Sequence, residues 1–221
     1  MNIVDAIVII ILLAGLVVGF KRGVIKQTVK FLGSIGVIVG SVILKTPVAM
    51  FLSATFPFIK FNGLSSLNIL LYEVVAFVLV LIILTIIFKL LCLISGWIEK
   101  LFKATIILSI PSKILGAVVG LFEAYLVVFV LFILLSSPIF NFKLVNDSKS
   151  KDFILNKTPV LSILSENIVN TFEEVWELRN SEQKDNLDQE IYEILMDNKI
   201  INRETIDKMI ESGKINLEEE E

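Results

Sequence analysis

The sequence predicts an all-α integral membrane protein: a four-helix bundle with an interfacial helix and a C-terminal acidic helical tail. First, the 221 residues are 55% apolar and only 19% charged, with a mean hydropathy of +0.83, whereas a soluble domain is about 45 to 50% apolar and about 25% charged. Second, long apolar runs recur before residue 140. Third, residues 1–140 carry a net charge of +6 and residues 141–221 one of −9. These two parts are the predicted membrane domain and tail.

Four apolar stretches are candidates for bilayer-spanning helices, which need about 20 residues to cross a hydrocarbon core of about 30 Å. The first is followed by Lys21 and Arg22, a polarity opposite to that of a cleaved signal peptide. The second is long enough only if its helix begins near Val24, and Thr46 and Pro47 are expected to end it. The predicted spans are residues 3–20, 24–44, 67–91 and 112–135.

Other residues suit the bilayer surface. Residues 96–110 predict a short interfacial helix, because apolar and charged side chains separate onto two sides: Trp97, Ile98, Leu101 and Phe102 against Glu99, Lys100 and Lys103. Three charged residues near span ends, Asp5, Glu73 and Lys89, are expected to be interfacial anchors.

Basic residues in the short connections predict the orientation, because cytoplasmic loops are enriched in lysine and arginine. The connections after the first and third spans hold eight: Lys21, Arg22, Lys26, Lys30, Lys89, Lys100, Lys103 and Lys113. The connection after the second span holds two, Lys45 and Lys60. We therefore expect a multi-pass membrane protein with both termini outside the cytoplasm. Lys143, Lys149, Lys151 and Lys157, just after the fourth span, oppose this orientation.

The tail has the pattern of a soluble amphipathic chain. Apolar residues recur at three-to-four spacing from Val160 to Trp176 and predict one helix. Residues 187–195 predict a second. Asn202 is expected to cap a third helix, which Gly213 ends. So small a set of helices can form only a small core, so we expect the tail to pack against its own membrane domain or against a partner.

The composition excludes several chemistries. The chain has no histidine and a single cysteine, Cys92, so imidazole metal sites, a histidine base, a disulfide and a thiolate zinc site are not expected. Phosphate-loop, nucleophile-elbow and zinc-protease motifs are missing from the sequence. We therefore predict no catalytic, cofactor-binding or metal-binding residues, no enzyme activity and no nucleic-acid partner.

Glycines recur at helical spacing in three of the four spans. The sets are Gly15, Gly19 and Gly23; Gly33, Gly36 and Gly40; and Gly116 and Gly120. Small residues allow helix backbones to approach closely in lipid, where helix association has no hydrophobic drive. These positions predict a tightly packed bundle or a homo-oligomer. A moving gate or a permeation path is the alternative.

Glu123 is the outlying residue of the fourth span. It lies about ten residues after Lys113, roughly 15 Å along a helix, and hence near the bilayer midplane. A carboxylate there costs about 2.5 to 3.5 kcal/mol on insertion scales, which favours a position facing protein. Lys30, with Lys26 nearby, is the expected partner in an intramembrane pair. Three interpretations are open: a carboxylate that holds helices together, one that passes protons or ions, and a span shifted along the membrane.

Three segments, taken in order and spacing, carry a family resemblance. They are Asp5 at the start of the first span, the junction Gly19-Phe20-Lys21-Arg22-Gly23 followed by Lys26-Gln27, and Leu115-Gly116-Ala117-Val118-Val119-Gly120 in the fourth span. With these, residues 1 to about 140 resemble the colicin V production (CvpA) family of bacterial inner-membrane proteins. The resemblance implies four spans, outward termini and a part in colicin V production or export, without an established molecular activity. Ser112 and Glu123-Ala124 depart from the family pattern.

Two function hypotheses follow. The first is a non-enzymatic accessory or scaffold in toxin production or export and envelope homeostasis, favoured by the glycine faces and the acidic tail. The alternative is a small oligomeric transporter or channel that uses Glu123 beside Lys26 and Lys30. An intramembrane enzyme ranks third, because no catalytic constellation accompanies Glu123. Expected partners are the lipid bilayer, further copies or other membrane proteins, and an unidentified protein that binds the tail.

Overall fold

The computed structural model describes residues 2–56, 64–94, 110–140, 142–159, 161–180, 186–211 and 213. Within these ranges the secondary structure is α-helical, without a β-strand. Four helices are long and apolar enough to cross a membrane, which confirms the predicted all-α membrane bundle. They are α1 (Ile3–Arg22), α2 (Val24–Thr55), α3 (Ser65–Ile94) and α5 (Ile110–Leu135).

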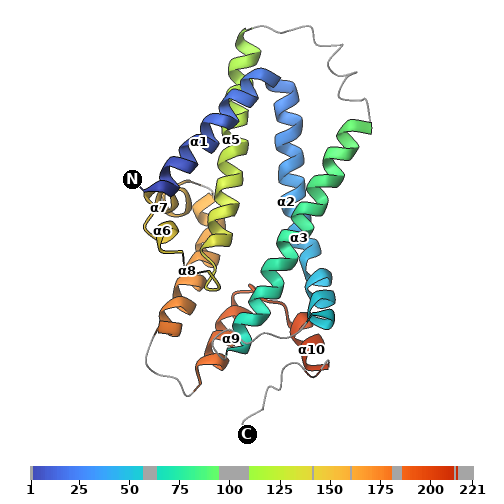
Figure 1. The fold of residues 1–221 in the computed structure, drawn as a ribbon, viewed down its shortest axis with the longest axis vertical. Coiled ribbons are helices and arrows are strands. Elements are labelled where there is room, and N and C mark those ends of the chain that lie inside the picture. Colours follow the sequence, from blue (N-terminus) through green and yellow to red (C-terminus); the bar gives the residue numbers. More distant parts are fainter. Residues whose placement is uncertain are drawn as a thin grey trace.

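The spanning helices pack in the order α1, α5, α2, α3 (Figure 1). Gly23 is the single residue between α1 and α2, with φ 77° and ψ 166°. This left-handed φ favours glycine, which has no Cβ to clash with the backbone. The predicted basic connection between the first two spans is therefore a sharp turn, and Lys26 and Lys30 belong to α2 itself.

The predicted end of the second span at Thr46 and Pro47 is wrong. The α2 helix continues to Thr55 with Pro47 inside it. Proline removes one backbone hydrogen bond from a helix interior. Beyond Pro47, however, Ala49 and Leu52 are buried in a core with the tail, and this packing holds the helix together across the proline.

The tail consists of α6 (Lys143–Asn146), α7 (Lys149–Asn156), α8 (Leu161–Asn180), α9 (Leu187–Asp197) and α10 (Arg203–Glu211). The last three occupy the positions of the predicted tail helices, and the Asn202 side chain accepts a 2.9 Å hydrogen bond from the Glu204 amide as expected of a cap. The sequence pattern missed α6 and α7. The predicted interfacial helix lies outside the described residues, apart from Ile110, which begins α5.

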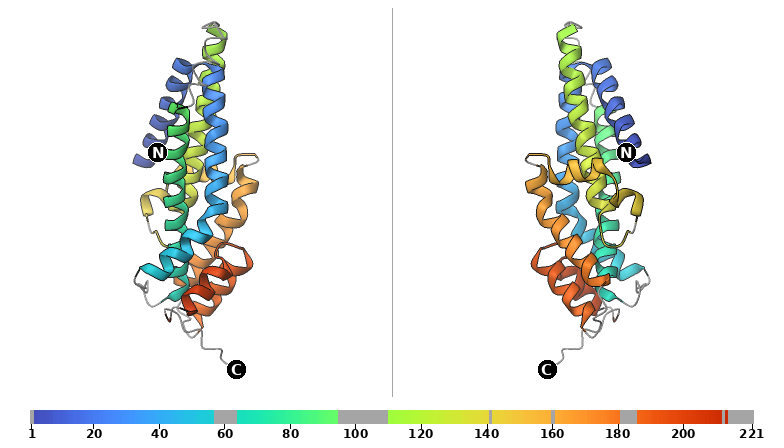
Figure 2. Two further views of the ribbon diagram at one scale, coloured as in Figure 1. Left: turned by 90° about the vertical axis from the view of Figure 1, so that its right-hand side faces the viewer. Right: turned by 90° about the vertical axis from the view of Figure 1, so that its left-hand side faces the viewer.

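The C-terminal end of α2 and the first turns of α3 share a core with the tail. This core gathers at the end of the molecule away from the α1–α2 turn (Figure 2). Its fully buried members include Leu67 and Leu70 of α3, Val175 of α8, Ile191 and Leu195 of α9, and Ile206 and Met209 of α10. Because tail and spans share this core, the division at residue 140 stays a prediction.

Candidate functional site

Small residues bring the backbones of α1 and α5 into contact. A Cβ added to Gly19 would lie 2.9 Å from the carbonyl carbon of Gly116 and 2.9 Å from the Cα of Gly120. A Cβ added to Gly120 would lie 2.8 Å from the Cα of Gly19. Gly15 faces Gly120 and Ala124 one turn further on. Any side chain in this row would force the two helices apart.

The glycines of α2 lie in different surroundings. Gly33 faces the ring of Phe88 on α3, and a Cβ at Gly40 would lie 3.0 Å from a methyl group of Leu84. Gly36 has open space beside it. These contacts lie within one chain, so the predicted homo-oligomer stays a prediction.

A polar network joins α5 to α2 within the membrane part. The carboxylate of half-buried Glu123 accepts hydrogen bonds from the side-chain amide of Gln27 and from the hydroxyl of Ser34, the latter at 3.0 Å. Gln27 is 1% exposed, and its amide oxygen accepts a 3.2 Å hydrogen bond from the Arg22 guanidinium. The network therefore runs from the end of α1 to the middle of α5.

Lys30, the predicted partner of Glu123, is not among these hydrogen bonds. It is half-buried on α2, within electrostatic range of Glu123 but also of Arg22 and Lys89. Lys26 is exposed. Two neutral donors take the place that the sequence assigned to a cation. This fits a membrane interior, because a neutral donor costs less to remove from water than an ammonium group.

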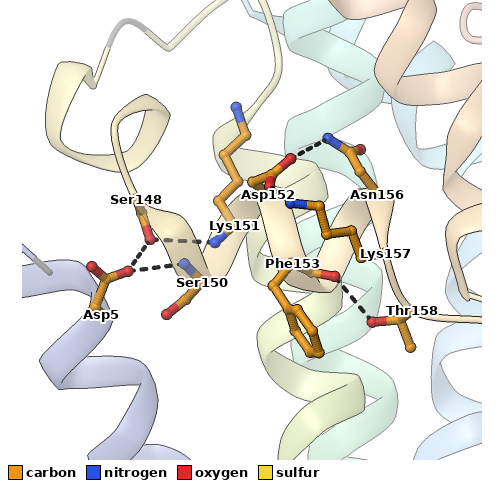
Figure 3. Close-up of polar contacts among 9 residues, drawn as sticks. All are labelled: Asp5, Ser148, Ser150, Lys151, Asp152, Phe153, Asn156, Lys157 and Thr158. Atoms are coloured by element: carbon orange, nitrogen blue, oxygen red, sulfur yellow. Dashed lines mark hydrogen bonds and ion pairs between the residues drawn. The ribbon is translucent and has the colours of Figure 1, made fainter.

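A second polar cluster fixes α7 against the start of α1 (Figure 3). Asp5 is 2% exposed. Its carboxylate accepts a 2.7 Å hydrogen bond from the Ser148 hydroxyl and a 2.9 Å bond from the Ser150 amide. It also accepts a 2.7 Å hydrogen bond from the backbone amide of Asn2, and this bond completes a capping box at the start of α1. The expected interfacial anchor is thus a buried acceptor that joins two helices.

The rest of α7 carries charged residues in contrasting surroundings. The Lys157 ammonium lies 2.6 Å from the Asp152 carboxylate, and with the amide of Asn156 it holds the pKa of Asp152 below its ordinary value. Burial lowers the pKa of Lys151, which donates to Asn146 at 3.0 Å. Exposed ion pairs of the Lys157–Asp152 kind contribute little to stability, so α7 is held by the hydrogen bonds to Asp5 and by its buried side chains, Ile154 and Leu155.

A third cluster joins the tail to the ends of α2 and α3. Glu73 is 2% exposed, and its carboxylate forms a 3.0 Å ion pair with Lys45. The Thr205 hydroxyl on α10 donates to the same carboxylate at 2.7 Å, and Lys45 also donates to the carbonyl of Ile200 at 3.2 Å.

Asp188 on α9 caps the start of α3 from outside that helix. It accepts hydrogen bonds from the amides of Ser65 and Ser66 at 2.7 and 2.8 Å.

The sequence singled out Asp5, Glu73 and Glu123 but not the side chains that contact them. The missed side chains are Gln27, Ser34, Lys45, Ser148 and Thr205. The signal that could have found them is the pairing of each buried acid with donors at the same depth on a neighbouring helix. Lys89, the third expected anchor, is exposed.

Each of the buried acids Asp5, Glu73 and Glu123 is a single carboxylate surrounded by hydrogen-bond donors. Among the described residues there is no group of three or more His, Cys, Asp or Glu able to hold a metal ion. Cys92 is half-buried in α3. The arrangement can hold helices together and, at Glu123, present a carboxylate within the membrane part.

Residues 4–159 match the model of a family described as colicin V production protein, which confirms the resemblance inferred from the sequence. The match covers the four spans as well as α6 and α7. No curated protein and no solved structure matches the chain.

Proposed function

The chain belongs to the colicin V production protein family, and from this premise we propose that it is a non-enzymatic membrane scaffold. In this role it is an accessory in toxin production or export and in envelope homeostasis. The observation that supports the proposal is the third cluster, which ties the tail to α2 and α3 through the buried Glu73 carboxylate and the Asp188 cap. A tail held in this way is a fixed platform beside the membrane.

The outer surface of the platform is acidic. Exposed carboxylates lie along its three longest helices: Glu173, Glu174 and Glu177 on α8, Glu190, Glu193 and Asp197 on α9, and Glu204, Asp207 and Glu211 on α10. Exposed carboxylates outnumber the exposed cations, Lys199, Arg203 and Lys208, on these helices and the turn between α9 and α10. A surface with an excess of negative charge attracts and orients a partner of the opposite charge. The partner class that fits is therefore a protein with a basic surface.

The test is association in native membranes. The variant E173Q/E174Q/E177Q removes three exposed charges from one helix without touching the core, and it should lose the complex or the complementing activity. The matched control, R203Q/K208Q, changes exposed charges of opposite sign on α10 and should retain both. If the tail variant keeps the same complex and complements fully, the scaffold proposal has no support.

The proposal also includes a location for the platform: outside the cytoplasm, in the bacterial cytoplasmic membrane. In a C92A background, E174C places a thiol on an exposed tail position and K21C places one at the opposite end of the spans. An impermeant thiol reagent should label E174C in intact cells and K21C only after lysis. The reverse pattern would put the tail in the cytoplasm.

The second candidate function is an oligomeric channel or transporter. The observation that favours it is the polar network from Arg22 through Gln27 to Glu123, which carries polar atoms from the end of α1 to the middle of α5. Proton or ion flux in liposomes should then fall in E123Q. A purified protein without flux would leave the carboxylate as a link between helices, and E123Q would then be coupled in stability to Q27L rather than to K30M.

A further inference from the structure

The α6–α7 segment (residues 142–159) exposes apolar side chains that its own packing does not use. Phe142, Leu144 and Phe153 are 50%, 59% and 57% exposed, and Ile163, at the start of α8, is 73% exposed. Exposed lysines are interspersed with them: Lys143, Lys149 and Lys157. Single exposed apolar residues are common on protein surfaces, so the position of this segment relative to the bilayer decides what these side chains contact.

The N-terminal end of the α6–α7 segment lies beside the start of α1, where α1 enters the bilayer. The Asn2 side chain donates a 2.6 Å hydrogen bond to the carbonyl of Leu144, and Asp5 holds the start of α7 through Ser148 and Ser150. The apolar run of α1 begins at Ile3. The α6 helix and the start of α7 are therefore at the level of the lipid headgroups.

The other end of the segment reaches further along the spans. The hydroxyl of Thr158 is hydrogen-bonded to the hydroxyl of Tyr125 on α5. Tyr125 precedes Leu135, the last residue of α5, by about 15 Å of helix at about 1.5 Å per residue. A contact at that depth brings the connection between α7 and α8 down beside α5, toward the acyl chains.

The side chains of α7 divide accordingly. In Figure 3 the ring of Phe153 points down, in the direction in which α1 runs from Asp5 into the membrane, whereas the Lys151 side chain points the opposite way. An amphipathic helix in a membrane surface places its apolar side chains toward the acyl chains and its cations toward phosphate. On α7, Phe153 and Lys151 have this arrangement, and Lys149 lies one turn before Phe153 on the same face, at the start of the helix that Asp5 holds at the headgroup level.

We propose that the α6–α7 segment is a phospholipid-binding shelf, seated in the leaflet on the tail side of the membrane. Phe153 enters the boundary between headgroups and acyl chains, and Lys143 and Lys149 contact the phosphates of anionic headgroups. Charge complementarity and direct continuity with the lipid-facing surfaces of α1 and α5 favour this occupant over a protein. The shelf would fix the height of the tail relative to the bilayer, since Asp5 joins it to α1.

The test measures the depth of a spin label in the full-length protein. Nitroxide is attached to F153C in a C92A background, in vesicles of phosphatidylethanolamine and phosphatidylglycerol. The matched control is I210C, an exposed apolar position on α10, in the part of the tail away from the shelf. The label at position 153 should collide more with oxygen, which dissolves in lipid, than with a water-soluble nickel chelate; the label at position 210 should show the opposite. Equal accessibility ratios at the two positions would overturn the proposal.

Two further measurements keep the proposal testable. If F153C does not accumulate, I163C provides a second label next to the same connection and should give the same lipid-facing result. Replacing phosphatidylglycerol by phosphatidylcholine, or introducing K143Q/K149Q, should raise nickel accessibility at position 153 by the same factor. An effect of the lipid change that persists in K143Q/K149Q would refute the contact between these lysines and phosphate.

Discussion

Breaking the Lys45–Glu73 pair from one side should destabilise the tail strongly. Glu73 is 2% exposed and has a 3.0 Å ion pair with Lys45 and a 2.7 Å hydrogen bond from Thr205. Lys45→Met keeps the length of the side chain but leaves the buried carboxylate with Thr205 alone. Loss of one partner of a buried pair costs about 3 to 5 kcal/mol. The Lys45 side chain is 21% exposed, so water can reach it and the lower end of that range applies.

Glu73→Gln should cost less, because it removes the buried charge itself. The glutamine oxygen can still accept the hydrogen bond from Thr205, and Lys45 keeps its bond to the carbonyl of Ile200. A lost hydrogen bond to a charged group costs about 1.5 to 3 kcal/mol. In the double variant no unpaired charge remains buried. The two defects should therefore be less than additive, by about 1 to 3 kcal/mol.

The assay is denaturant unfolding in detergent micelles, followed by the fluorescence of Trp176 on α8 in a W97F background. Lys208→Met and Glu211→Gln form the control cycle, because that pair is also an ion pair, at 2.9 Å, but its side chains are 48% and 67% exposed. Its coupling should not exceed about 0.5 kcal/mol. Additivity of Lys45→Met and Glu73→Gln within about 0.5 kcal/mol would refute the reasoning.

Three other predictions concern the remaining contacts. Gly19→Ala inserts a methyl group against the α5 backbone and should cost about 1 to 3 kcal/mol, whereas Gly36→Ala has open space and should leave thermal stability in detergent unchanged or raised. Asp188→Ala removes the cap of α3 and should lower the stability followed by Trp176 by about 0.5 to 2 kcal/mol; no loss would mean that water replaces the carboxylate. Asp5→Ala removes the acceptor that holds α7, so hydrogen exchange should accelerate across Lys149–Asn156 and not across Leu187–Asp197.

The length of the apolar runs and the spacing of the glycines were the two signals from which most of the fold could be predicted. The spans follow from run length alone, because a helix must cross a hydrocarbon layer of fixed thickness. Four-residue spacing of Gly15 and Gly19 also indicated a close-packed face. It could not indicate which helix faces it, since the matching row, Gly116 and Gly120, lies almost a hundred residues away, and Gly36 shares the pattern without the contact.

Pro47 shows why local signals failed at the membrane boundary. Taken alone, a proline after an apolar run predicts the end of a helix. The outcome depended instead on residues beyond it: Ala49 and Leu52 are buried against a core whose other members come from the tail. A local breaker costs about 3 kcal/mol, and fully burying a large apolar side chain returns about 1.5 to 3 kcal/mol. Tertiary contacts of this size are invisible in a window around the proline.

The hydrogen-bond donors of Glu123 also could not be identified from local sequence alone. Counting residues gives depth, and it placed Lys30 at a level close to that of Glu123; Gln27 and Ser34 lie three residues before and four residues after Lys30, on the same stripe of α2. It does not say which member of that stripe contributes the donor. The long stem of a lysine allows its ammonium to reach a more polar level, whereas Gln27 and Ser34 are neutral and donate to Glu123. An acid at membrane depth therefore predicts a hydrogen-bond donor at its level, and the donor that costs least to bury, rather than the one with opposite charge, takes the position.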